Sequence, residues 1–193
     1  MTADEFWQWF AAQEQALRGV DGQTVADSVE VRLREIDSRI GVEVSDPGDP
    51  RELIFTAWSQ AEAFPAVREL VAAAPVLRGW QIIALKPPRG FAFGMNLDGL
   101  KIDASRIQFD PLAAEEDPKL LGVRFYVPGA TDEDDERLSR ALPIIIETGI
   151  GEEAAAQIDH MDFAAGAIPD EKALPIEQLL PYIQWHRRKH GLE

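Results

Sequence analysis

Residues 53–87 predict a strand, a helix and a second strand, and this succession constrains the fold more than any other stretch. An apolar run at residues 53–58 is followed by a helix over about residues 64–73, whose apolar side chains recur at helical spacing. Pro75 ends that helix, and residues 80–85 form a second apolar run, which predicts an interior strand buried on both faces. A unit of this length usually makes a parallel strand pair with a right-handed crossover.

Two helices are predicted before this unit, and together they should form an antiparallel hairpin. Thr2 and Glu5 have capping-box spacing at the start of the first helix, which extends to about Gly19. The second helix is predicted from Thr24, because an apolar stripe steps by three and four residues as far as Ile40. Next, an alternating segment at residues 41–45 predicts a strand that forms a hairpin with residues 53–58.

Four more segments predict strands beyond the central unit: residues 99–103, 105–109, 121–127 and 154–163. The last is ambiguous between strand and helix, and we favour a strand because Ile158 and the flanking glycines suit a sheet.

Two helices are predicted in this second half of the sequence. Thr131 should cap a helix that opens with acidic residues and runs toward Gly149, with Pro143 splitting or kinking it. The last helix should carry Pro175 in its first turn.

These elements predict an α+β fold in a single domain over residues 1–193. A helical hairpin (1–40) should precede a sheet with covering helices (41–193). We expect one mixed sheet of five to seven strands, with the helices mainly on one face.

The charge of the chain excludes several classes of partner. Its formal net charge is −15 and its pI is about 4.6, so the surface should repel nucleic acid and anionic membranes. A basic protein partner would suit this surface, although acidity can also serve solubility alone. The sequence contains no cysteine, which excludes disulfides and thiolate chemistry. Its acidic, aromatic N-terminus lacks signal-peptide features, which predicts cytoplasmic residence.

Few residues suggest chemistry, and no cofactor is predicted. Lys86 and Arg89 form a basic loop at the end of a central strand, where α/β sheets often bind ligands, so an anion site is one interpretation and a solvated strand end the other. In a strand, His160 and Asp162 share a face and are candidates for an acid/base pair, although a surface ion pair is commoner.

Three further residues are weak candidates for binding. His186 and His190 have the i,i+4 spacing of two helical metal ligands, but interaction with the helix dipole explains them as well. Trp7 lies at the flank of the apolar face of the first helix, so it is either a contact for a partner or part of the core. Nucleophile-elbow, phosphate-loop and dinucleotide-binding motifs are all absent from the sequence.

Three blocks carry a family resemblance: FWQWF near the N-terminus, TAWSQAEAFPAVRELVAAAPVLRGWQIIALKP in the centre and LPIEQLLPYIQWHRR near the C-terminus. On these blocks the chain resembles a group of uncharacterised bacterial proteins. The resemblance implies a shared fold over the full chain and implies no activity.

The chain is strongly acidic and its sequence contains no catalytic motif. Together these two features favour a non-enzymatic protein-interaction module, of the adaptor or toxin-neutralising type. The competing hypothesis is a small-molecule enzyme or ligand-binding protein with a site near His160 or Lys86.

Overall fold

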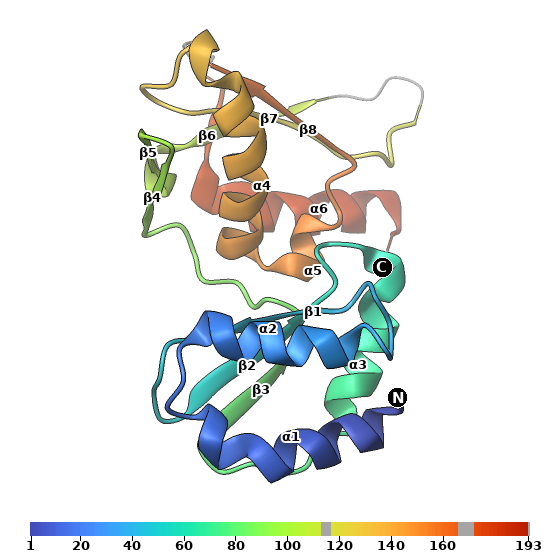
Figure 1. Ribbon diagram of the computed structural model, residues 1–193. Coiled ribbons are helices and arrows are strands. Elements are labelled where there is room, and N and C mark those ends of the chain that lie inside the picture. The colour runs from blue at the N-terminus through green and yellow to red at the C-terminus, as the bar shows by residue number, and fades with distance from the viewer. Residues whose placement is uncertain (113–116, 166–171, 193) are drawn as a thin grey trace. The chain divides into compact units, whose positions relative to one another are not determined.

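The computed structural model describes residues 1–112, 117–165 and 172–192 (Figure 1). The chain divides into two compact units, residues 1–87 and 88–193, and each is described by itself. The sequence placed a boundary after residue 40, but the N-terminal helices belong to the same unit as the first sheet. The single domain over residues 1–193 stays a prediction.

Helix α1 (Ala3–Leu17) begins at the predicted capping box, where the Glu5 amide donates to Thr2 Oγ1 over 3.2 Å and the Thr2 amide donates to Glu5 Oε2 over 2.7 Å. Helix α2 (Gly22–Leu33) begins two residues before the predicted start. Its N-cap is Asp21, whose carboxylate accepts from the Thr24 amide over 2.9 Å. It also ends earlier than predicted, because the apolar stripe continues beyond the helix to a buried Ile40.

The first sheet has the strand order β1 (Gly41–Val44), β2 (Arg51–Thr56) and β3 (Trp80–Ala84). The predicted hairpin and the parallel pair are both confirmed: β1 and β2 are antiparallel, β2 and β3 are parallel, and helix α3 (Phe64–Ala72) connects them after a short 3-10 turn, η1 (Ala61–Ala63).

The prediction of β3 as an interior strand is wrong. Within the described residues β3 pairs with β2 alone, so β2 is the central strand. Leu53 in β2 is fully buried, whereas its β3 partner Ile82 is only half-buried. An apolar run alone does not say which of two strands is central, because partial cover of both faces also favours apolar residues.

Aromatic side chains of α1 pack on this sheet and form the core of the first unit. Phe6 lies 5.9 Å from Phe55 and Phe10 lies 5.2 Å from Trp80, each pair edge to face. Such pairs add about 0.5–1.5 kcal/mol to the stabilisation that burial of their area provides.

One buried cation connects the end of α1 to the sheet. Arg51 is fully buried, and its guanidinium donates to the carbonyls of Leu17 and Ser45, each over 2.8 Å. It also lies over the Trp80 ring, 5.4 Å from the centroid. Desolvation lowers the pKa of Arg51, yet the guanidinium remains charged at neutral pH. Arg51 thus satisfies a carbonyl at the C-terminus of α1.

The second unit contains a hairpin, a four-stranded sheet and three α-helices among the residues described. The hairpin is β4 (Gly94–Leu97) and β5 (Leu100–Asp103), and the sheet has the order β8 (His160–Ala164), β7 (Gly122–Tyr126), β6 (Gln108–Leu112) and β9 (Leu174–Pro175). The helices are α4 (Asp135–Ile150), α5 (Glu152–Ala155) and α6 (Leu179–His190), and the 3-10 turns are η2 (Ala104–Arg106), η3 (Asp132–Asp134) and η4 (Ile176–Gln178).

The α+β class is confirmed, but the single mixed sheet is not, because the described residues form three small sheets. The segment 154–163 contains the end of α5 and the start of β8, so the strand prediction holds for its second part only. Pro143 lies within an unbroken α4. Pro175 pairs with Gln108 in β9 instead of opening the last helix.

Alternate residues of β6 and β7 build the core of the second unit. Phe109, Val123 and Phe125 are fully buried and pack in one cluster with residues of α4 and α6. The C-terminal end of α4 approaches closely through Gly149, where a Cβ atom would lie 2.1 Å from the Phe91 ring. A larger residue at this position would therefore displace the ring.

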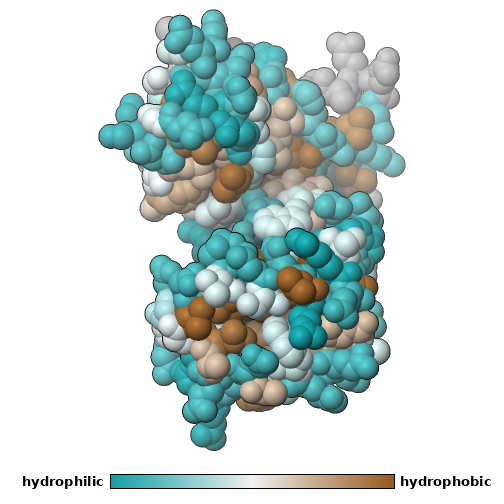
Figure 2. All heavy atoms as spheres, in the orientation of Figure 1, coloured by the Kyte–Doolittle hydropathy of each residue, from teal (hydrophilic) through white to brown (hydrophobic). Residues whose placement is uncertain are grey.

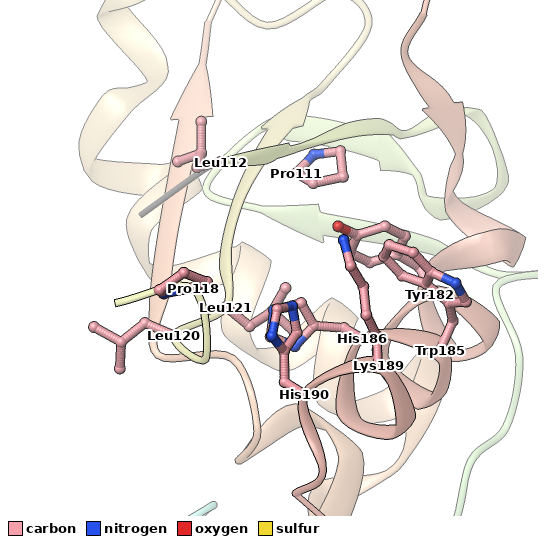
Figure 3. Close-up of a pocket in the computed structure, with 10 residues that line it drawn as sticks. All are labelled: Pro111, Leu112, Pro118, Leu120, Leu121, Tyr182, Trp185, His186, Lys189 and His190. Atoms are coloured by element: carbon pink, nitrogen blue, oxygen red, sulfur yellow. The ribbon is translucent and has the colours of Figure 1, made fainter. Parts of the chain in front are cut away.

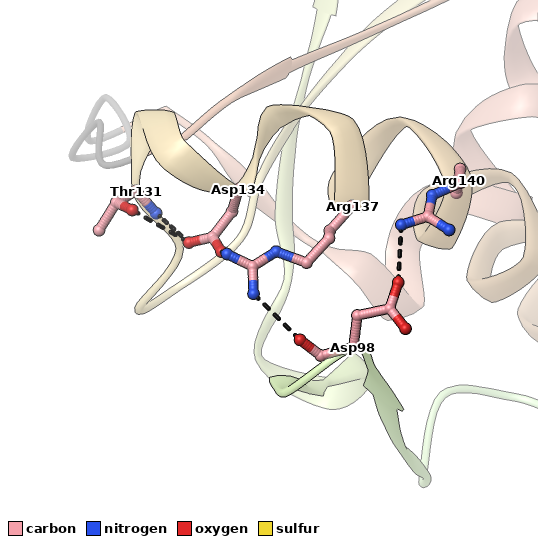
Figure 4. A network of polar contacts seen from close by, with 5 residues as sticks. All are labelled: Asp98, Thr131, Asp134, Arg137 and Arg140. Atoms are coloured by element: carbon pink, nitrogen blue, oxygen red, sulfur yellow. Dashed lines mark hydrogen bonds and ion pairs between the residues drawn. The ribbon is translucent and has the colours of Figure 1, made fainter.

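A polar network joins the β4–β5 turn to α4 (Figure 4). Arg140 Nη2 lies 2.8 Å from the Asp98 carboxylate, and Arg137 Nη1 donates to the Asp98 carbonyl over 3.2 Å. Arg137 also pairs with Asp134, whose carboxylate accepts from the amide and hydroxyl of Thr131 in a capping box. Thr131 thus forms a cap as predicted, although it caps the turn η3, and α4 follows from Asp135.

The face drawn in Figure 2 is largely hydrophilic, with apolar side chains in small patches. No helix in the described part of the chain combines the length and apolarity that crossing a bilayer requires.

Candidate functional site

A groove of about 220 Å³ lies beside helix α6 in the second unit (Figure 3). One wall comes from the segment around β6 and β7: Pro111, Leu112, Pro118, Leu120 and Leu121. The other wall is one face of α6: Tyr182, Trp185, His186, Lys189 and His190. We call this hollow the α6 groove.

The spacing of α6 explains why these side chains share a wall. Tyr182, Trp185 and Lys189 stand three and four residues apart and therefore lie on one face of the helix. On the adjoining face of the helix, Leu179 and Ile183 are fully buried in the core, and His186 and His190 continue that face toward the groove. The core thus fixes the rotation of α6 and directs the aromatic face into the groove.

The aromatic wall is anchored to the sheet. The Tyr182 ring lies 6.0 Å from the buried Phe109 ring, edge to face, and 5.3 Å from the Trp185 ring. Burial raises the pKa of Tyr182, so its phenol is protonated at neutral pH and can donate a hydrogen bond. Trp185 is 45% exposed and stands at the mouth of the groove.

The two histidines lie side by side in the groove, with ring centroids 4.6 Å apart. His186 is buried, whereas His190 is half-buried. Desolvation lowers the pKa of His190 below 6.5, and the neighbouring His186 and Lys189 lower it further. Lys119 acts in the same direction and Asp117 opposes them. The imidazole of His190 is therefore neutral at pH 7 and carries one N–H donor.

The polar groups of the groove are mainly donors. The Lys189 ammonium lies 4.7 Å from the centroid of the Trp185 ring. None of the described residues that line the groove is acidic. In a chain with net charge −15, this local surplus of positive charge distinguishes the groove from its surroundings.

The candidate metal ligands are part of this groove. His186 and His190 lie together, but among residues 1–112, 117–165 and 172–192 no cluster of three or more His, Asp or Glu side chains could hold a metal ion. Two imidazoles beside Lys189 provide few ligands and a repulsive charge for a cation.

Lys86 and Arg89 fall on opposite sides of the division between the units. Lys86 Nζ lies 2.6 Å from Glu43 Oε1 and 4.6 Å from the centroid of the Trp58 ring. The Arg89 amide donates to the Thr148 carbonyl over 2.9 Å. The Lys86 ammonium therefore already has an anionic partner in Glu43, and this ion pair explains the residue without the predicted anion site.

His160 and Asp162 lie on one face of β8, as predicted. However, Asp162 is paired with Arg124 on the adjacent strand, with Arg124 Nη2 2.7 Å from Asp162 Oδ2. The hydrogen bond from Arg124 is the main cause of the lowered pKa of Asp162. A carboxylate held ionised in this way is a weak base, so the ion-pair interpretation fits the geometry better.

Trp7 belongs to the core. Its side chain is 2% exposed, and its indole Nε1 donates to the Leu70 carbonyl over 2.7 Å. The interpretation of Trp7 as an exposed partner contact is therefore wrong, because the flank of α1 that carries it is covered by α3.

No family model, curated protein or solved structure matches the chain. The resemblance to a bacterial group stays an expectation, and the candidate site rests on geometry alone.

Sequence reasoning identified the two histidines of the groove and missed its aromatic wall. The spacing of Tyr182 and Trp185 marks an aromatic stripe, with Lys189 four residues further on. The opposite wall follows only from the pairing of β6 with β7.

Proposed function

We propose that this protein is a non-enzymatic protein-interaction module, of the adaptor or toxin-neutralising type, and that a partner docks at the α6 groove. The observation that carries the proposal is a pair of exposed apolar side chains at the groove, Leu120 at 47% and Trp185 at 45%. Large apolar side chains that adjoin a hollow are typical of interaction sites.

The size of the groove favours a side chain over a larger ligand. Pockets for drug-sized molecules measure about 300–1,000 Å³. At about 220 Å³ the groove suits one residue of a partner chain or a molecule with a single ring.

The surroundings of the candidate catalytic groups also support a non-enzymatic role. The Asp162 carboxylate is paired with Arg124, and the Lys86 ammonium is paired with Glu43. Neither geometry favours proton transfer to a substrate.

Charge suggests the kind of partner. A net charge of −15 favours the approach of a protein with a basic surface, and it disfavours nucleic acid and anionic membranes. Such a partner would meet the protein in the cytoplasm.

Affinity capture from the native host tests the proposal, with the full chain and two variants as bait. Trp185→Asp puts a charge into the groove, and Ile144→Asp is the matched control on α4, where Ile144 is 50% exposed. We expect a stoichiometric partner on the wild type and on the control, and its loss from Trp185→Asp. Repeated recovery of the bait alone, or equal recovery of a partner with both variants, contradicts the proposal.

Binding kinetics of the captured partner test the role of charge. Electrostatic attraction acts mainly on the association rate and is screened over about 8 Å at physiological ionic strength. The association rate should therefore fall as salt rises. A rate that is indifferent to salt removes the charge argument and leaves the groove as the contact.

The second candidate function is a small-molecule enzyme or ligand-binding protein that uses Lys86 or His160. The observation in its favour is the Lys86 side chain, which is only 13% exposed beside Trp58. An activity screen that includes His160→Ala and Lys86→Met separates the two candidates. Activity that either substitution abolishes would reverse our ranking.

A further inference from the structure

We infer that the α6 groove binds the C-terminal residue of the partner chain, with the aromatic ring of that residue between the walls and its terminal carboxylate against the basic end of α6. This inference rests on the proposed function, because it specifies what docks in the same groove.

The walls select a flat apolar group. Tyr182 and Trp185 offer aromatic surface on one side, and Leu120 and Pro118 offer apolar surface on the other (Figure 3). Aromatic rings gain from edge-to-face and offset contacts with such a wall. A ring also has few rotatable bonds to immobilise, which reduces the entropic cost of docking.

The polar groups select a negative charge next to that ring. Lys189 supplies an ammonium group, and His186 and His190 each supply at least one N–H donor. A carboxylate accepts such donors in charge-assisted hydrogen bonds, which are shorter and stronger than neutral ones. A neutral group would gain no such charge-assisted contact, and a cationic group would be repelled by Lys189.

The electrostatics of the helix end allow an anion here. The C-terminus of a helix carries a partial negative charge, which by itself would repel a carboxylate. In α6 the last turn carries Arg187, Arg188 and Lys189, and their three positive charges exceed that partial charge. Arg187 donates to the Leu192 carbonyl beyond the helix, which leaves Lys189 as the cation that faces the groove.

The small volume of the groove favours the C-terminal residue of a partner over two neighbouring residues within its chain. A carboxylate on a separate Asp or Glu side chain would require two side chains in a groove of about 220 Å³. A C-terminal Phe, Tyr or Trp places the ring and the carboxylate on one residue. The net charge of the protein further favours basic residues upstream of that terminus.

Short peptides test this inference. The probe Lys-Gly-Ser-Gly-Ser-Phe is prepared with a free C-terminal carboxylate, with a C-terminal amide and with Ala in place of Phe, and each is titrated into the full chain. Binding is followed through the indole N–H signal of Trp185 and the ring signals of His190. We expect the free acid to bind about tenfold or more tightly than the amide, and the Ala peptide to bind weakly.

Two variants assign the contacts. Lys189→Gln should remove the difference between acid and amide while the Phe peptide still binds. Trp185→Ala should weaken both Phe peptides. Ile144→Asp is the control and should bind the peptides like the wild type.

The outcomes separate this inference from the proposed function. Equal binding of acid and amide overturns the role of the carboxylate, although a partner that Trp185→Asp releases would still support docking. A captured partner that depends on Trp185 without binding of any peptide overturns the chain-terminus inference alone. If phenylacetate binds and the peptides do not, the groove takes a free small anion and the chain-terminus inference fails. Docking at this groove fails as well if Trp185→Asp and Ile144→Asp then recover a partner equally.

Discussion

The indole Nε1 of Trp7 donates a hydrogen bond to the main-chain carbonyl of Leu70 over 2.7 Å, and this bond joins helix α1 to helix α3. Both groups are buried, and the residues stand 63 positions apart in the sequence. The N-terminal helix is therefore held on its unit by a directional contact as well as by apolar packing.

Replacing Trp7 with Phe should destabilise the first unit. The substitution keeps an aromatic ring but leaves the buried Leu70 carbonyl without its donor, which costs about 1–3 kcal/mol. Chemical denaturation followed by circular dichroism measures the loss. Trp9→Phe in the same helix is the control, because Trp9 is only half-buried and should tolerate the change better. Equal losses for the two variants would contradict the role of the Leu70 bond.

The difference in burial between the parallel strands β2 and β3 gives a second prediction. Leu53→Asp would bury an unpaired carboxylate in the central strand β2, at a cost of several kcal/mol that threatens a typical stability of about 5–15 kcal/mol. Ile82→Asp, at the directly paired position of β3, should cost roughly 1–3 kcal/mol because Ile82 is half-buried. Thermal unfolding compares the variants. A larger loss of thermal stability for Ile82→Asp than for Leu53→Asp would indicate that β3, and not β2, is the central strand.

The sequence was informative where a local pattern has one structural solution. The capping box at Thr2, a cap at Thr131 and the parallel pairing of β2 with β3 follow from short-range spacing and crossover length. The position of β3 at the edge does not follow from its own residues, because it depends on which strands pair. Likewise, the α6 groove depends on segments far apart in the chain, and only its two histidines stood out in the sequence.

The cap of η3, the turn that leads into α4, gives a third prediction. Asp134→Ala removes the acceptor for the amide and hydroxyl of Thr131 and the ion-pair partner of Arg137 (Figure 4). Loss of an N-terminal cap costs about 0.5–2 kcal/mol, and we expect a value toward the upper end of this range because Asp134 is buried.

The matched control is Asp98→Asn, which removes an exposed ion pair with Arg140 and keeps the carbonyl that accepts from Arg137. It should cost at most about 1 kcal/mol. Urea denaturation of both variants is the measurement, and a larger effect at Asp98 would contradict the importance of the cap.

The last prediction concerns the protonation of Asp162. The Arg124 hydrogen bond is the main cause of its lowered pKa, and His160 contributes least among the causes. Arg124→Gln should therefore raise the pKa of Asp162 toward 3.8, whereas His160→Ala should move it little. Carbon-detected NMR of the Asp162 carboxyl group, titrated from pH 2 to pH 7, measures both shifts.

The same pKa has a consequence for stability. Because the folded-state pKa lies below the unfolded one, the Asp162–Arg124 pair stabilises the fold fully at pH values above about 4. That contribution is lost as the pH falls through the folded pKa, and Arg124→Gln should flatten this part of the stability profile. Arg140→Gln is the control, since Arg140 pairs with Asp98 and should leave the Asp162 titration unchanged. If His160→Ala raises the pKa of Asp162 more than Arg124→Gln does, His160 is the main partner of Asp162. That result would support the hypothesis of an enzyme in which these two residues are the acid/base pair.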